Sequence, residues 1–107
     1  MLTEFVKVAS KNDMADNSMM SVTVGKDEFV LARVEGEYFA LSGWCSHENG
    51  LLAEGQLHAD TCEVECPVHE AYFDLKTGNA TALPADRPVL AYPVKVEGDD
   101  ILIGPQH

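Results

Sequence analysis

The sequence predicts an all-β fold, an antiparallel sandwich or small barrel. Short stretches rich in Val, Phe, Tyr and Ile are separated by glycine-containing turns at close spacing, which is typical of these architectures. The chain has 107 residues, a length for which one domain is expected. Hydrophobic residues make up 46% of it, so we expect a packed core rather than a disordered chain.

The expected strands are separated by recognisable turns. Gly25-Lys26 and Glu35-Gly36 are turn sequences between apolar stretches, and Gly98-Asp99-Asp100 is the turn of a closing hairpin. Ser10 to Met14 has the composition of a single capped helical turn. The expected strands cover 3–8, 18–24, 27–34, 37–41, 63–65, 72–75, 92–97 and 101–104.

Residues 42 to 84 differ from the rest of the chain. They contain all three Cys, the single Trp and three of the four His. We therefore predict one domain over 1–107, with a smaller metal-binding subdomain at about 42–84 inserted into a β framework.

Two motifs in this segment carry the chemistry, Cys45-Ser46-His47 and Cys66-Pro67-Val68-His69. Each supplies one thiolate and one imidazole. Two Cys and two His divided evenly over two loops form the ligand set of a [2Fe–2S] centre in which two His replace two Cys on one iron. Structural zinc remains an alternative, although zinc sites usually pair Cys with Cys and His with His. A catalytic Cys–His pair is a weaker alternative, because it leaves the second pair without a role.

The ligand set also predicts the direction of the redox chemistry. Two thiolates neutralise a core of two ferric ions and two sulfides, and neutral imidazoles add no charge. An electron therefore enters a neutral centre, which places its potential above that of an all-Cys plant-type ferredoxin. A protein of this kind transfers single electrons, so we expect a carrier and not an enzyme.

The charge balance restricts the partners. There are 18 acidic and 7 basic residues, which argues against binding to nucleic acid or to a membrane surface. No Lys or Arg occurs between Arg33 and Lys76. We interpret the acidic residues of this interval as a docking face near the metal for a basic partner surface, with an ordinary solvated surface as the alternative. They are Glu35, Glu37, Glu48, Glu54, Asp60, Glu63, Glu65, Glu70 and Asp74.

The sequence predicts a cytoplasmic protein. It has no apolar run long enough for a transmembrane helix, and its first residues lack the basic and apolar regions of a signal peptide. The odd number of Cys makes a disulfide framework improbable. We interpret Cys62 as a packing residue, with ligation as a weak alternative, His58 as part of a surface loop, and Trp44 as packing near the metal.

The chain resembles a known family. The stretch from Cys66 to Gly78, CPVHEAYFDLKTG, is similar to the C-P-x-H-x-x-x-F-D-x-x-T-G pattern of Rieske-type ferredoxins, which serve bacterial aromatic-ring-hydroxylating dioxygenase systems. The resemblance implies the Rieske fold and one [2Fe–2S] cluster per chain. It implies that Cys45 and Cys66 bind the inner iron, that His47 and His69 bind the outer iron, and that a loop at 82–85 lies beside the cluster.

The same resemblance implies the partners and an alternative. A ferredoxin of this kind is a monomer that accepts electrons from an NAD(P)H-dependent ferredoxin reductase and passes them to a terminal oxygenase through transient, electrostatic contacts. A Rieske-like small subunit of a nitrite reductase is the alternative function; such subunits often lack one or more of the ligands, and all four are present here.

Departures from other Rieske proteins predict a low potential. Neither ligand loop has the extra Cys of respiratory Rieske proteins, and Ala71 stands where high-potential members have a hydroxyl. Fewer donors to the sulfurs stabilise the reduced state less, so we expect a value towards the lower end of about −150 to +300 mV. Glu48 and Glu70 follow the two ligand His. Two carboxylates there should lower the potential further; the alternative is that both are solvated surface residues.

Overall fold

The computed structural model describes residues 3–44, 50–67, 71–82 and 88–105. Every strand pairing in these residues is antiparallel, so the all-β prediction is confirmed. The elements are β1 (Val6–Ser10), η1 (Lys11–Asp13), β2 (Ser18–Val24), β3 (Asp27–Val34), β4 (Glu37–Ser42), η2 (Leu52–Glu54), β5 (Gln56–His58), β6 (Glu63–Glu65), β7 (Tyr72–Asp74), β8 (Ala80–Ala82), β9 (Ala91–Tyr92), β10 (Val94–Glu97) and β11 (Asp100–Ile103), where η denotes a 3₁₀ turn.

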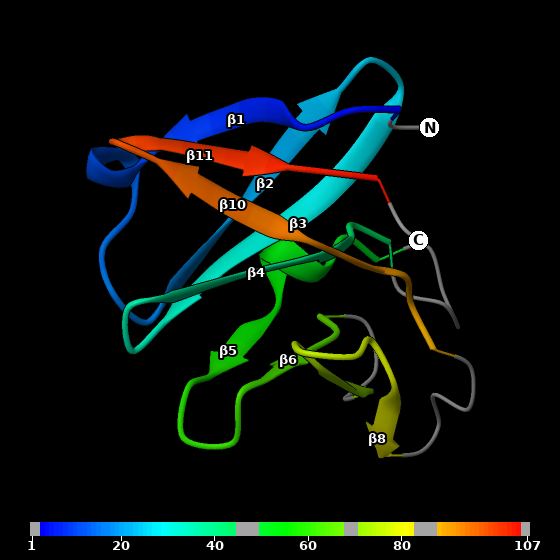
Figure 1. The fold of residues 1–107 in the computed structure, drawn as a ribbon. Helices are drawn as coiled ribbons and strands as arrows, with labels where there is room; N and C mark the ends of the chain where they lie inside the picture. Colours follow the sequence, from blue (N-terminus) through cyan, green and yellow to red (C-terminus); the bar gives the residue numbers. More distant parts are fainter. Residues whose placement is uncertain (1–2, 45–49, 68–70, 83–87, 106–107) are drawn as a thin grey trace.

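These strands form three sheets, and Figure 1 shows how they are layered. One sheet has the order β1-β11-β10, the second β2-β3-β4-β9, and the third β5-β6-β7-β8. The β1-β11-β10 sheet crosses over the long strands β2 and β3, and the green to yellow strands of the third sheet lie at the other side of β4. We call the first two sheets the framework and the third sheet, β5 to β8, the small sheet.

The long framework strands are joined by tight two-residue turns. Val24 pairs with Asp27 around one turn, and Val34 pairs with Glu37 around the next. In the second turn Glu35 and Gly36 have φ angles of 49° and 82°. This combination is that of a type I′ turn, whose twist matches the twist of the flanking strands.

Strand β3 is buried on both faces and separates two cores. Successive side chains of a strand point to opposite sides, and Val30, Leu31 and Ala32 are all fully buried. Phe29 and Leu31 pack against the β1-β11-β10 sheet, together with Ile101 and Ile103. The other face belongs to the core shared with the small sheet, whose buried members are Val30, Ala32, Val34, Leu41, Leu52, Val64, Cys66, Ala71, Phe73, Leu75 and Val89.

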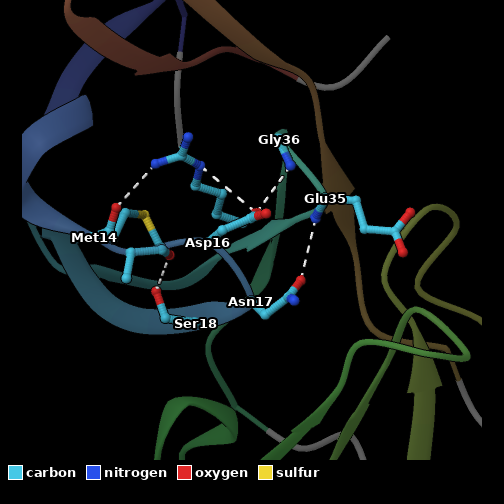
Figure 2. Close-up of polar contacts among 8 residues, drawn as sticks. Met14, Asp16, Asn17, Ser18, Glu35 and Gly36 are labelled. Carbon is cyan, nitrogen blue, oxygen red and sulfur yellow. Dashed lines mark hydrogen bonds and ion pairs between the residues drawn. The ribbon is translucent and has the colours of Figure 1, made fainter.

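The loop before β2 is held against the β3–β4 turn by side-chain hydrogen bonds, shown in Figure 2. The backbone N–H of Gly36 donates to Asp16 Oδ1 at 2.9 Å, and that of Glu35 donates to Asn17 Oδ1 at 3.2 Å. Arg33 Nη1 donates to the carbonyl oxygen of Met14 at 3.1 Å. These bonds join residues that are 18 to 20 positions apart in the sequence, so they stabilise the turn end of the framework.

The terminal strands differ in detail from the sequence prediction. The first strand begins at Val6 and not at Thr3, and a bulge between Lys7 and Ala9 breaks its alternation. The expected strand 92–97 is divided at Pro93, so that β9 pairs with β4 and β10 pairs with β11. Because proline has no N–H to donate, it is suited to the point where the chain changes sheets.

The small sheet was only partly predicted. Strands β6 and β7 lie where the sequence predicts them, whereas the sequence does not predict β5 and β8. Each of the four strands has only three residues, which is too short to show a periodic pattern. All of them lie within 42–84, the segment expected to form the metal-binding subdomain.

Candidate metal centre

Cys66 is the one predicted ligand in the part of the chain that the structure describes; Cys45, His47 and His69 lie outside it. Cys66 follows β6 directly and is 2% exposed. Its backbone N–H donates to the carbonyl oxygen of Ala71 at 2.7 Å. This bond continues the β6–β7 hairpin by one step and closes the base of the second ligand loop.

The base of the first ligand loop is closed in a similar way. Trp44 and Leu51 form an antiparallel bridge on either side of residues 45–50. The N–H of Leu52 donates to the carbonyl oxygen of Gly43 at 2.8 Å, and Leu52 itself is fully buried. Paired backbone at Trp44 and Leu51 therefore borders the first predicted ligand motif, as the pairing of Cys66 with Ala71 does for the second.

The two loop bases meet in one core. Leu41 and Leu52, which flank the first loop, pack in the same buried cluster as Cys66 and Ala71, which flank the second. Val89, just after residues 83–87, belongs to that cluster too. The expected loop at 82–85 begins at the last residue of β8, and the rest of it lies outside the described residues.

The segment that contains Val89 joins the small sheet to the framework. The N–H of Val89 donates to the carbonyl oxygen of Gly78 at 2.8 Å, and the N–H of Ser42 donates to the carbonyl oxygen of Leu90 at 2.8 Å. This segment therefore bridges the turn after β7 and the end of β4.

The donor chemistry at these loop bases fits an iron–sulfur centre. A buried thiol such as Cys66 suits a thiolate ligand that is shielded from water, and the paired C-x-H and C-x-x-H motifs supply the donors of a mixed Cys and His site. Among residues 3–44, 50–67, 71–82 and 88–105, no three His, Cys, Asp or Glu side chains are grouped as a metal site. The described part of the chain thus offers no competing set of ligands.

Cys62 lies away from this centre, in the turn that precedes β6. Its φ of 57° is in the left-handed region, and its side chain packs at the edge of the shared core. Burial raises the pKa of the Cys62 thiol above its ordinary value, and nearby Lys76 acts in the opposite direction. The prediction that Cys62 is a partly buried packing residue is confirmed.

Another expectation is wrong. His58 is not in a loop but at the end of β5, where its Nε2 lies 2.8 Å from Glu65 Oε1 and its ring lies 5.2 Å from that of Tyr72. A strand of three residues is too short for the sequence to indicate that His58 lies in it. Trp44 is 48% exposed, and its expected packing near the metal stays a prediction, because Cys45, His47 and His69 lie outside the described residues.

Three of the acidic residues expected near the metal lie in a groove at the β3–β4 turn. Glu35, Glu37 and Asp60 line a groove of about 300 Å³ between the β3–β4 and β5–β6 turns. Strand β4 runs from Glu37 towards Trp44, a distance on the order of 20 Å. The expectation of a single acidic face near the metal is therefore wrong for these residues. Glu65 does adjoin Cys66, while Glu48 and Glu70 lie outside the described residues.

Sequence reasoning missed Gly55, which contacts the backbone on both sides of Cys66. A Cβ atom at Gly55 would lie 1.8 Å from the carbonyl oxygen of Glu65 and 3.1 Å from the nitrogen of Pro67. A glycine that lies outside a turn sequence often marks a close approach of two backbones. The presence of Gly55 at such a position is the feature of the sequence that could have indicated this contact.

An antiparallel β framework in which the bases of two predicted ligand loops share one core indicates a small metalloprotein. Comparison with known proteins identifies its family. Residues 4–93 match the Rieske [2Fe-2S] domain. The chain belongs to the Rieske [2Fe–2S] family, and membership implies a [2Fe–2S] cluster.

Within that family the chain is similar to ferredoxin components of aromatic dioxygenases. It is 41% identical over 97 residues, 91% of this chain and 89% of the relative, to the ferredoxin component of biphenyl 2,3-dioxygenase of Rhodococcus jostii (strain RHA1). It is 52% identical over 73 residues, 68% of each chain, to the ferredoxin subunit of 3-phenylpropionate/cinnamic acid dioxygenase of Escherichia coli (strain K12).

Solved structures agree with this similarity. The ferredoxin of carbazole 1,9a-dioxygenase from Nocardioides aromaticivorans IC177 is 38% identical with a TM-score of 0.92, over 97% of this chain and 100% of that one. A ferredoxin in complex with the oxygenase of carbazole 1,9a-dioxygenase is 28% identical with a TM-score of 0.86, over 94% and 92% of the two chains.

A more distant structure bears on the alternative function. A putative nitrite reductase small subunit from Mycobacterium tuberculosis is 16% identical with a TM-score of 0.84, over 96% of each chain. At that identity the likeness shows a shared fold alone.

In the described residues, no helix has the length and apolar character needed to span a membrane.

Proposed function

We propose that this chain is a one-electron carrier that takes electrons from an NAD(P)H-dependent ferredoxin reductase and delivers them to a terminal ring-hydroxylating oxygenase. The observation that carries the proposal is the match to ferredoxin components over nearly the whole of both chains. Because a carrier returns to its oxidised form after each delivery, it requires a reductant as well as an acceptor.

The ligands of the cluster in this proposal are Cys45, His47, Cys66 and His69, and residues 42–84 form the subdomain that holds them. When bound, the cluster supplies reversible one-electron chemistry at one site per chain. Cys66 presents its thiolate from within the shared core, where water is excluded. The two imidazoles would form the exposed side of the site, through which the electron leaves.

The proposed contacts with both partners are small and transient, because a carrier must dissociate quickly. The formal net charge of −11 favours steering towards basic surfaces of the partners. The complex of a related ferredoxin with its oxygenase supports the oxygenase as one partner. The proposal includes a monomeric state and a cytoplasmic location.

The proposal is tested first on the metal. Analysis of the purified protein should give two irons and two acid-labile sulfides per chain, and the reduced protein should give the EPR spectrum of a mixed Cys and His centre. Stoichiometric zinc without sulfide would refute the redox function. With a ferredoxin reductase and an oxygenase present, the rate of electron transfer should fall as salt increases, since screening weakens charge steering; a rate that is independent of salt would refute the electrostatic docking.

A further inference from the structure

Gly55 lies in close contact with the backbone on both sides of Cys66. A Cβ atom at this position would lie 1.8 Å from the carbonyl oxygen of Glu65, 3.0 Å from its carbonyl carbon and 3.1 Å from the nitrogen of Pro67. All three are backbone atoms, which cannot rotate aside as the end of a flexible side chain can. Any residue other than glycine therefore has to displace one of the two chains.

A close backbone contact, and not a positive φ, distinguishes this glycine. Gly55 has φ of −86°, outside the left-handed region that favours glycine. By contrast, Gly36 has φ of +82° and no atom within 4 Å of an added Cβ. The two positions therefore separate the effect of a close backbone contact from the effect of a strained turn.

The chain that carries Gly55 is anchored to the base of the first ligand loop. The N–H of Gly55 donates to the carbonyl oxygen of Leu52 at 3.0 Å, and the N–H of Leu52 donates to the carbonyl oxygen of Gly43 at 2.8 Å. Leu52 is fully buried, so η2 cannot move outward without opening the core. Gly55 is thus connected to residues on both sides of the first loop.

The chain that carries Cys66 is held from its other side by the β6–β7 hairpin. Cys66 donates its N–H to Ala71 at 2.7 Å, and Glu65 pairs with both Gln56 and Tyr72. Displacement by a side chain at position 55 would therefore fall on Glu65, Cys66 and Pro67 rather than being absorbed in flexible chain.

We infer that Gly55 is a positioning residue for the metal centre: its missing side chain sets how closely the backbone of Cys66 approaches the base of the first ligand loop. The inference rests on the proposed role of Cys66 as a ligand. The position of a ligating thiolate and the hydrogen bonds around it tune both the retention and the potential of an iron–sulfur centre. A shift of this backbone should therefore change both quantities.

The test compares Gly55→Ala with Gly36→Ala in the full, cluster-loaded chain. Gly55→Ala should release iron to a chelator on the order of tenfold faster than the wild type and should shift the reduction potential and the EPR g values. Gly36→Ala should lower resistance to urea through turn strain, yet keep the wild-type g values and potential. The inference is overturned if Gly55→Ala keeps the wild-type g values and reduction potential. It is also overturned if Gly55→Ala and Gly36→Ala change these two quantities equally.

A second pair of variants applies if Gly55→Ala does not fold. Leu52→Val shortens the side chain that anchors η2, and Ile101→Val removes the same one carbon from the core under the β1-β11-β10 sheet. Leu52→Val alone should change the g values and the rate of iron release; equal behaviour of the pair would overturn the inference. Absence of the mixed-ligand signal in the wild type would instead refute the proposed function, so the two failures are distinguishable.

Discussion

The framework and the small sheet are stabilised in different ways. In the framework, β2 and β3 pair without a break, from Ser18 opposite Arg33 to Val24 opposite Asp27. Strand β3 is also buried on both faces. The small sheet has strands of three residues each, and so few ladder bonds make an isolated sheet marginal. Its geometry therefore depends on contacts with the framework and on the metal that its loops are proposed to bind.

Removal of a proposed ligand should separate the two regions most clearly. Cys66→Ala removes a buried thiolate donor, so we expect loss of nearly all iron and of the EPR signal. Hydrogen exchange should show lost protection in β5 to β8, whereas β2 and β3 stay protected, because only the small sheet depends on the metal.

Cys62→Ala is the matched control for that experiment, because it removes the other described thiol from the same core. We expect it to retain iron and the wild-type spectrum. Iron loss in Cys62→Ala together with retention in Cys66→Ala would reverse the assignment of the ligand.

The same substitution, Phe to Ala, can be made once in each of the two cores, which allows a direct comparison between them. Phe73 lies in the small sheet and Phe29 in the framework, and both are at most 2% exposed. Substitution of either by Ala should lower the free energy of unfolding by about 3–5 kcal/mol, measured by urea titration. In folded samples, Phe73→Ala should also lose iron to a chelator faster, while Phe29→Ala should not. Equal iron loss in both variants would show that the two cores act as one unit.

The same contrast explains what could be predicted from the sequence. The strands 18–24 and 27–34 match β2 and β3 at every residue, because they are long and bounded by turn sequences. The family and its cofactor follow from the spacing of Cys45, His47, Cys66 and His69. By comparison, three-residue strands carry no periodic pattern. Strands β6 and β7 could be expected because they flank the second ligand motif, whereas no motif marks β5 and β8.

The contacts that place the site were less accessible from sequence. The approach of Gly55 to Glu65 and the bond from Val89 to Gly78 join segments that only the fold brings together. His58 was misplaced for the same reason, since its partner Glu65 is seven residues away on another strand. Residue spacing indicates which side chains bind, whereas these tertiary contacts determine how the loops are held.

The Asp16 contact tests the turn end of the framework with a smaller expected effect. Asp16→Ala removes the acceptor for the N–H of Gly36 and the ion-pair partner of Arg33. We expect a loss of about 1–2 kcal/mol in the free energy of unfolding, with no change in reduction potential. Glu97→Gln, which alters an exposed ion pair with Lys95, is the control and should change stability by less than about 0.5 kcal/mol. A changed potential in Asp16→Ala would mean that this end is coupled to the metal.

The smallest expected effect on stability is that of Glu28, and it depends on pH. Its carboxylate accepts hydrogen bonds from Thr23 Oγ1 at 2.6 Å and Ser21 Oγ at 2.9 Å, and these bonds lower the pKa of Glu28 below its ordinary value of 4.5. A carboxyl whose pKa is lower in the folded state stabilises that state above its unfolded pKa, and the contribution is lost as pH falls through the folded pKa.

Urea midpoints measured from pH 7 down to about pH 3 should show this dependence. At neutral pH the urea midpoint of the wild type should be higher than that of Glu28→Gln. The difference between the two midpoints should shrink as the Glu28 carboxylate is protonated. Thr23→Val removes the main donor and should reduce the same pH dependence. Because Glu28 lies on β3 in the framework, iron release should be the same in all three proteins at every pH. A constant gap between the midpoints would refute the role of the ionised carboxylate, and altered iron release would weaken the separation of framework and small sheet.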